Sequence, residues 1–393
     1  MLFFRCSSSQ ASGEMFDVVV VGAGLIGSAA AKYLARSGMS VALVGPVEPS
    51  NYADTEVFAS HYDEGRIVRS IDKDEFWSEL AQASLARFSA IEKESGIRFH
   101  ERVGFLHAGF PPGHEGDALS NVLRMSARFG IAVARLEGEE LRRAFPFFAF
   151  EKACEGLLES GLSGYVNPKG LAAAQQAIFA KRGGTLIRDV VDRIGRNGAA
   201  YTIQGRQNSY SAARVVVSAG AWTHLNRLTP HGIHVDVRPE TVILIPVTAE
   251  EAASLHEMPP LWYTFDWHPI IPYLYLVPPL RFPDGRFYIK LGADNDRDVG
   301  STTADEAAAY FRSGGSQVTR RNLKDVADRF LPMFADRDVL TKPCILTYTA
   351  DRRPLIMETE PGWFVATAGN GAGAKSSDEI GRLASELVLG RGH

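Results

Sequence analysis

Three glycines near the start of the chain have the spacing of a dinucleotide-binding turn. Gly22, Gly24 and Gly27 form a G-x-G-x-x-G pattern within DVVVVGAGLIGSAAAKYLARSG, residues 17–38. In such a turn the first glycine permits a tight bend, the second lets the backbone approach a pyrophosphate, and the third lets the following helix pack against the strand. The free N–H groups at the start of that helix would face the phosphates. The pattern by itself fits NAD and FAD equally well.

Several basic side chains occur where a fixed charge would be chemically useful. Arg66 and Arg69 lie three residues apart in SHYDEGRIVR, and Lys375 follows three glycines in AGNGAGAKSS. A guanidinium can hold a carboxylate with two parallel hydrogen bonds. Lys290 lies inside the apolar segment FYIKLG, where a charge is costly unless it faces a cavity or a partner. Simpler interpretations stay open: a solvated helix face for the arginines, a solvent lysine for Lys375, and an edge-strand lysine facing water for Lys290.

Motifs for other chemistries are absent from the sequence. It contains no H-E-x-x-H, C-x-x-C or G-x-S-x-G pattern, which argues against zinc or serine hydrolysis. Cys6, Cys154 and Cys344 are too few and too scattered for a disulfide framework or a cysteine-rich metal site. We therefore expect no metal ion, and a reducing, cytoplasmic compartment.

The elements that would position these residues begin with a βαβ pattern. A β-branched run ends at Gly22, an Ala-rich helical pattern follows, and a second strand is predicted over 40–44. A third strand, predicted over 209–218, also runs into a Gly-containing turn, and a fourth, over 363–367, leads through a glycine-rich turn into a helix predicted over 378–389. Because distant strands can join one sheet, we expect an interrupted domain.

Length and composition indicate a folded protein without an affinity for polyanions or lipid. The chain has 393 residues, which favours two domains, and it is 45% hydrophobic and 22% charged. A net charge of -4 gives no general attraction to nucleic acid or an anionic membrane. No apolar run approaches the roughly 18 residues of a membrane-spanning helix. Residues 1–14 lack the build of a secretion signal, and we expect a disordered extension, with Met15 an equally good start of the functional chain.

Four stretches together resemble the amino-acid-oxidase-like flavoproteins, most closely the group of monomeric sarcosine, pipecolate and N-methyltryptophan oxidases. Their order and spacing carry the resemblance over nearly the whole chain. They are GAGLIGSAAAKYLARSG from Gly22, ASHYDEGRIVR from Ala59, VVVSAGAWT from Val215, and CILTYTADRRP from Cys344 with AGNGAGAKSS from Ala368.

This resemblance implies an α/β fold with two domains. A Rossmann-like FAD-binding domain would be built from separated segments, beside an α+β substrate domain with a large antiparallel sheet over the flavin. We assign residues 15–100, 160–226 and 344–393 to the FAD-binding domain and residues 101–159 and 227–343 to the substrate domain.

The resemblance also implies roles for individual side chains. Arg69 and Lys375 match the pair that holds the substrate carboxylate, and Arg66 matches an arginine near the flavin ring. Lys290 matches the lysine that promotes the reaction with O2, where a fixed cation lowers the barrier to superoxide. Cys344 matches the cysteine joined to the flavin 8α-methyl carbon, but a lone apolar cysteine is otherwise a small core residue. Covalent attachment is therefore an open question.

The remaining expected contacts concern the cofactor. The glycine-rich turn before Lys375 would let the backbone approach the flavin, and the following helix end would stabilise negative charge on the reduced ring. His61 falls on a histidine of the family's loop, while Tyr62 replaces a second one. The expected cofactor-binding set is Gly22, Gly24, Leu25, Ile26, Gly27, Gly45, Glu48, Ser60, His61, Arg66, Val191, Cys344, Gly369, Gly371, Gly373 and Lys375.

Some positions depart from the family pattern. Gly45 stands where the family has an acidic residue for the adenosine ribose, so either Glu48 or backbone alone would hold it. Leu346 occupies an aromatic site of the pocket, Asp294 occupies a histidine site, and Tyr275 matches a pocket tyrosine across an insertion. The pocket is therefore expected to accept a different amine. Asp294 would either pair a second ammonium group or be a loop carboxylate.

Taken together, the sequence predicts a monomeric FAD-dependent oxidase of the C–N bond of a small secondary or cyclic amino (imino) acid. Hydride would pass to flavin N5, the imine would hydrolyse, and O2 would be reduced to hydrogen peroxide. Two alternatives fit the same residues: a flavin dehydrogenase that passes electrons to a carrier, and a flavin-binding protein without turnover.

Overall fold

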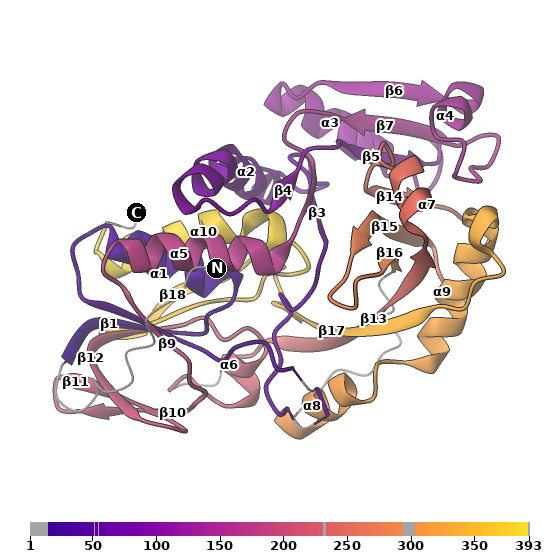
Figure 1. Ribbon diagram of the computed structural model, residues 1–393. Coiled ribbons are helices and arrows are strands. Elements are labelled where there is room, and N and C mark those ends of the chain that lie inside the picture. Colours follow the sequence, from indigo (N-terminus) through magenta and orange to yellow (C-terminus); the bar gives the residue numbers. More distant parts are fainter. Residues whose placement is uncertain (1–14, 51, 54, 231–232, 294–302, 392–393) are drawn as a thin grey trace.

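The β-branched run near the start of the chain forms a central strand of a first, eight-stranded sheet (Figure 1). The computed structural model describes residues 15–50, 52–53, 55–230, 233–293 and 303–391, so the expectations for residues 1–14 and for Asp294 lie outside the described residues. Val18, Val19 and Val20 are fully buried, because a parallel strand at the centre of a sheet is covered on both faces.

Strands from distant parts of the chain complete this sheet. β1 (Met15–Val21) lies in parallel between β2 (Val41–Val44) and β12 (Ser209–Val217). β19 (Trp363–Thr367) joins β12 in parallel, and the first paired residues, Val215 and Trp363, lie 148 positions apart in the chain. The remaining members are β9 (Thr185–Ile187), β10 (Val191–Asn197), β11 (Ala200–Gly205) and β18 (Leu355–Glu360). The expectation of a nucleotide-binding fold assembled from separated segments is confirmed.

Four helices cover one face of the first sheet (Figure 1). α1 packs between α5 and α10, and α2 lies across α10 and α5. The approach of α10 to α1 depends on Gly381, where a Cβ would stand 2.4 Å from the Cβ of Ala29. These helices are α1 (Leu25–Ala35), α2 (Glu75–Ser95), α5 (Pro168–Lys181) and α10 (Gly373–Val388). The last begins five residues earlier than the sequence predicted, which places Lys375 in its first turn.

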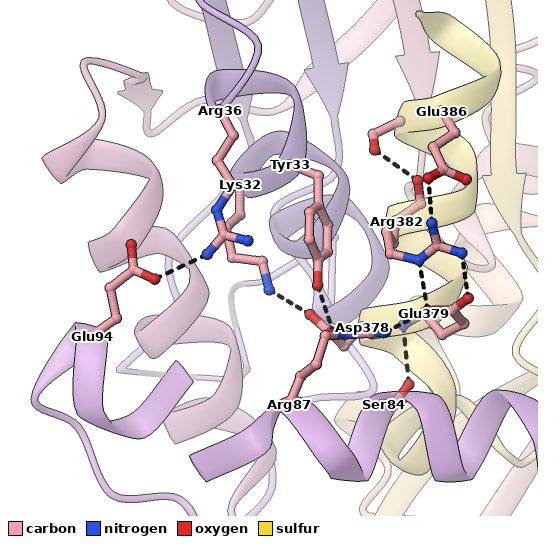
Figure 2. Close-up of polar contacts among 11 residues, drawn as sticks. Lys32, Tyr33, Arg36, Ser84, Arg87, Glu94, Asp378, Glu379, Arg382 and Glu386 are labelled. Atoms are coloured by element: carbon pink, nitrogen blue, oxygen red, sulfur yellow. Dashed lines mark hydrogen bonds and ion pairs between the residues drawn. The ribbon is translucent and has the colours of Figure 1, made fainter. Parts of the chain in front are cut away.

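A buried ion network joins three of these helices (Figure 2). Asp378 of α10 is fully buried and accepts hydrogen bonds from Lys32 and Tyr33 of α1 and from Arg87 of α2, the last at 2.6 Å. Burial lowers the pKa of Lys32, although Asp378 opposes the shift. Each of these buried charges depends on its partner, because an unpaired charge in the interior is costly.

Replacing Asp378 with Ala should therefore destabilise the protein strongly. The change leaves Lys32 buried without its carboxylate, and we expect a loss of about 3–5 kcal/mol in the free energy of unfolding. Glu386→Gln is the matched control, since this half-exposed carboxylate pairs with Arg382 at the surface end of the network and should cost about 1 kcal/mol at most. Urea denaturation of both variants tests this, and equal unfolding midpoints would contradict it.

The second sheet also has eight strands and forms the other half of the molecule (Figure 1). Its neighbours are antiparallel except for β14 and β5, which run in parallel. Helix α9 (Gln317–Phe330) packs on it, and Phe330 lies in its core with Tyr263 and Phe265. In order across the sheet the strands are β17 (Leu340–Tyr348), β13 (Asp236–Val247), β16 (Phe287–Gly292), β15 (Tyr273–Arg281), β14 (Leu261–Thr264), β5 (Phe105–Gly109), β7 (Glu155–Glu159) and β6 (Val133–Glu137).

A small third sheet and several short helices complete the fold. The third sheet has the order β3 (Arg66–Val68), β8 (Gly164–Val166), β4 (His100–Glu101). The other helices are α3 (Leu119–Phe129), α4 (Gly138–Ala144), α6 (Trp222–Leu225), α7 (Ala249–Ser254), α8 (Ala304–Arg312) and the 3-10 helix Pro332–Phe334. Strand β17 runs across the domain boundary predicted between residues 343 and 344, so the five-segment division stays a prediction. None of the helices described is long and apolar enough to cross a bilayer.

Candidate active site

A cavity of about 770 Å³ lies where the first sheet meets the second. The residues that follow β1, β2, β12 and β19 line one side of it, which places it at the carboxyl ends of the parallel strands, the usual ligand-binding edge of such sheets. Strands of the second sheet contribute Trp262, Tyr275, Lys290 and Leu346 to the opposite side. Its volume is in the upper part of the range for ligand sites, about 300–1,000 Å³.

The glycine turn after β1 forms one end of this cavity. Gly22 has φ +110°, and a Cβ there would lie 2.4 Å from the carbonyl oxygen of Ser218. A Cβ at Gly27 would lie 1.9 Å from the carbonyl oxygen of Gly22, so neither position tolerates a side chain. No side chain caps α1 at Gly24, which leaves the first N–H groups of the helix for an anion.

His61 lies beside this turn. Its Nδ1 atom would be 3.6 Å from a Cβ at Gly24, and His61 lines the cavity as predicted. Burial lowers the pKa of His61 to about 4, so the imidazole is neutral at physiological pH. The predicted residues Leu25, Ile26, Ser60, Val191, Gly369, Gly371 and Gly373 also line the cavity.

Gly45 stands at the position where an acidic residue that binds the adenosine ribose was expected. A Cβ there would lie 2.6 Å from the backbone nitrogen of Ala23, so the turn after β1 packs directly on the backbone of Gly45. Glu48 bonds the Tyr52 hydroxyl at 2.8 Å and Lys169 at 3.2 Å, and it does not line the cavity as the structure describes it. A ribose contact by Glu48 therefore stays a prediction without support from its position.

We expect Gly45→Ala to weaken cofactor binding. The new methyl group must push the glycine turn away from the cavity, because backbone atoms of Ala23 cannot move aside cheaply. Gly195→Ala is the control, since a Cβ there meets nothing within 4 Å. Flavin retained after gel filtration measures the effect, and equal flavin content in the two variants would refute it.

Arg66 and Lys290, which both line the cavity, share one buried carboxylate. Asp63 lies 3.1 Å from Arg66 Nη1 and also accepts a hydrogen bond from Lys290 Nζ, which donates to the Gly65 carbonyl at 2.8 Å as well. Lys290 is fully buried, so the alternative of an edge lysine facing water is wrong. Burial and then Arg66 lower the pKa of Lys290 to about 8. Burial would raise the pKa of Asp63, but Arg66 and Lys290 hold it below its usual range.

Cys344 lies beside Arg66 but is not among the residues that line the main cavity. Its Sγ atom accepts a hydrogen bond from Arg66 Nη2 at 3.2 Å. Cys344 lines a second cavity of about 180 Å³ that shares Ser60, Tyr62 and Arg66 with the first. The neighbouring guanidinium would favour a thiolate, but the sulfur is not on the wall of the main cavity, so the attachment to flavin stays a prediction.

Flavin attached through Cys344 should remain with the protein after acid precipitation, and Cys344→Ala should release it. Cys154→Ala is the control, because burial raises the pKa of that thiol to about 12 and keeps it unreactive. Absorbance of the supernatant at flavin wavelengths measures the release. Flavin that stays precipitated with the Cys344→Ala protein would rule out this attachment.

Arg69 and Lys375 meet on a carboxylate that the sequence analysis did not single out. Asp72 Oδ2 accepts hydrogen bonds from Arg69 Nη2 at 2.9 Å and from Lys375 Nζ. The guanidinium carbon of Arg69 also lies 5.3 Å from the ring centre of Phe105 and 5.7 Å from that of Trp262, within the range of cation–π attraction. The spacing of Asp72, three residues after Arg69, was the available signal in the sequence.

Two further buried acids were also missed. Glu159 is fully buried and accepts hydrogen bonds from the backbone nitrogens of Ser70 (2.7 Å) and Ile71 (3.2 Å), which fixes the chain just after Arg69. Glu240 lines the cavity and accepts a hydrogen bond from the hydroxyl of Tyr275. The sequence pattern did not point to either acid, because which side chains of a strand are buried depends on the fold.

In the first sheet, parallel strands end at a glycine turn beside a cavity that a second sheet closes from the other side, which is the arrangement of a dinucleotide-binding fold. Residues 17–387 match the profile of the FAD dependent oxidoreductase family known as DAO, and the chain belongs to this family. The residues present fit FAD: two glycines whose Cβ atoms would clash, uncapped helix N–H groups, and a cavity of about 770 Å³ that Arg66 and Lys290 also line.

Relatives and solved structures agree with this assignment. The chain is 24% identical to human peroxisomal sarcosine oxidase over 96% of this chain and 93% of the relative, and 24% identical to monomeric sarcosine oxidase of Bacillus sp. strain B-0618 over 95% and 92%. It is similar in fold to NikD, an amino acid oxidase of nikkomycin biosynthesis, with TM-score 0.77, 20% identity and coverage of 96% and 94%. L-proline dehydrogenase from P. horikoshii superposes with TM-score 0.76, 17% identity and coverage of 97% and 95%.

Proposed function

We propose that the protein oxidises the C–N bond of a small secondary or cyclic amino (imino) acid and uses O2 as the electron acceptor. The observation that carries this proposal is the meeting of Arg69 and Lys375 on one carboxylate oxygen of Asp72 at the cavity wall. Two cations that already share one carboxylate are spaced to hold another. The relatives named as sarcosine oxidases support an amine as the group oxidised.

The chain's own residues bind and orient the substrate. Its carboxylate would bind Arg69 and Lys375, and Trp262 and Tyr275 would flank the remainder, since both line the cavity. Lys290 and Arg66 supply fixed positive charge at the cavity wall, where they would stabilise negative charge that develops during the reaction. Bound FAD would supply the redox chemistry, as acceptor of the hydride equivalent and donor of electrons to O2. The protein therefore acts mainly through position and charge.

An anaerobic flavin-bleaching screen identifies the substrate class. The panel comprises N-methyl amino acids, cyclic imino acids and primary amino acids, and we expect bleaching by the first two groups. Hydrogen peroxide per substrate consumed then separates the oxidase from a dehydrogenase, since a dehydrogenase gives almost none while reducing a dye. Flavin that no member of the panel bleaches would favour a flavin-binding protein without turnover.

Arg69→Ala should raise KM for the substrate found in that screen. Losing one partner of a charged hydrogen-bonded pair costs about 2–4 kcal/mol, which corresponds to roughly 30- to 900-fold in affinity. Arg182→Ala, which removes a surface ion pair with Glu94, is the control and should leave KM unchanged. Steady-state kinetics measures both, and an unaltered KM in Arg69→Ala would refute the assigned carboxylate site.

Lys290→Met should slow the reaction of the reduced enzyme with O2 by about 100-fold or more, the usual effect of removing one preorganised electrostatic group. Reduction by substrate should change little, because Lys290 is assigned to the O2 step. Stopped-flow measurement of the two half-reactions tests the prediction. A normal rate of reoxidation would remove Lys290 from that role.

A further inference from the structure

The carboxylate of Asp72 is fixed in place by its surroundings. The residue is 7% exposed, and its backbone N–H donates to Ser78 Oγ at 2.9 Å. Its Oδ1 atom accepts from the backbone nitrogen of Asp74 at 3.3 Å, while Oδ2 faces Arg69 and Lys375. A side chain held on both oxygens and at its own backbone does not swing away to admit a ligand.

Arg69 and Lys375 retain donors for a ligand while they hold Asp72. Asp72 engages only Nη2 of Arg69 among the described contacts, and the Arg69 side chain, 18% exposed, lines the cavity. The Lys375 ammonium has three N–H groups and gives one of them to Asp72. A second carboxylate can therefore bind beside Asp72 without displacing it.

The position of Lys375 is unfavourable for a cation without this acid. The residue lies in the first turn of α10 (Gly373–Val388), where the helix dipole disfavours positive charge. Burial and then the Arg69 charge lower its pKa to about 8, against the opposing effect of Asp72. Burial would raise the pKa of Asp72, but Lys375 and Arg69 hold it below its usual range. The acid therefore stays ionised throughout the physiological range.

We propose that Asp72 is a positioning residue of the carboxylate site: its fixed charge keeps Lys375 protonated beside Arg69 and so sets the highest pH at which the pair binds a carboxylate. This inference rests on the proposed function, because it assumes that Arg69 and Lys375 hold the substrate carboxylate. It extends that function by giving the site a pH limit of its own, separate from the ionisation of the substrate amine.

The other charged groups near Lys375 do not replace Asp72. Glu159 raises the pKa of Lys375 less than Asp72 does, and its carboxylate already accepts hydrogen bonds from backbone N–H groups and lies 3.8 Å from His107. Burial lowers the pKa of His107, which keeps it neutral. On α10 itself, Asp378 and Glu379 are bound by Lys32 and Arg87. Asp74, on the same loop, pairs with Arg353 at 3.0 Å.

Calorimetric titration of the flavin-loaded protein with acetate and pyrrole-2-carboxylate tests this inference. Neither acid carries an ionisable amine, so the pH dependence between pH 6 and 10 reports on the protein. We expect wild-type affinity to fall above about pH 8, following the deprotonation of Lys375 in the free protein. In Asp72→Asn the fall should begin about one pH unit lower or more, while affinity at pH 6 should equal or exceed that of wild type.

Asp72→Glu, which keeps the negative charge, should restore the wild-type pH limit. Asp72→Asn would therefore bind at least as tightly as wild type at pH 6 and more weakly at high pH. General damage to the site would instead weaken binding at every pH. The inference is overturned if Asp72→Asn and wild type have the same pH limit, or if Asp72→Asn binds more tightly at every pH, because Asp72 would then be a competitor. Absence of carboxylate binding by wild type at any pH would instead contradict the carboxylate site, and with it the proposed function.

A measurement on wild type alone keeps the test decisive if Asp72→Asn does not fold. Calorimetry of acetate binding at pH 7 in two buffers of different ionisation enthalpy gives the number of protons taken up. We expect close to none, because Lys375 is already protonated. Uptake of about one proton per acetate would overturn the inference.

Discussion

The cost of burying charge governs the arrangement of this cavity. Arg66 and Lys290 share Asp63, and Arg69 and Lys375 share Asp72. In each group one carboxylate lies between two cations, so that each group keeps one net positive charge. An unpaired cation in a site of low dielectric would lose its proton or unfold its surroundings. Sharing an acid is what allows positive charge to persist beside the cofactor and substrate.

The rest of the fold serves to bring these two groups together. Both arginines and both acids come from one short stretch around β3, while Lys290 arrives from β16 of the second sheet and Lys375 from α10. α10 is held by the packing of Gly381 on α1 and by the buried Asp378 network. The cavity therefore depends on contacts between segments that lie hundreds of residues apart, and a change in the helix layer is expected to reach the site through Lys375.

Much of the fold could be predicted because its signals are local. The glycine spacing at Gly22 to Gly27 and the β-branched run before it determine a strand, a turn and a helix without reference to the remainder of the chain. The resemblance supplied the order of the distant segments, and with it the set of cofactor-facing glycines. Lys290 in an apolar strand was informative because a buried lysine must have a partner.

The acids of the site were not predictable in the same way. Asp63, Asp72 and Glu159 lie in stretches whose pattern does not show which side chains point inward, and each is paired with a residue far away in sequence, such as Lys290 or Lys375. For Glu48 the sequence was misleading. Its closeness to Gly45 in the chain suggested a ribose contact, but its carboxylate bonds Tyr52 and Lys169. Pairing across segments is fixed by the tertiary structure alone.

The central claim is that the cavity selects a carboxylate and oxidises the adjacent amine. The most direct test compares anaerobic reduction of the bound flavin by one N-methyl amino acid and by its uncharged amide, at equal concentrations. The account predicts fast bleaching by the acid and bleaching by the amide that is slower by about 100-fold or more, since a lost charged hydrogen-bonded pair costs several kcal/mol. Equal rates for the two compounds would contradict it.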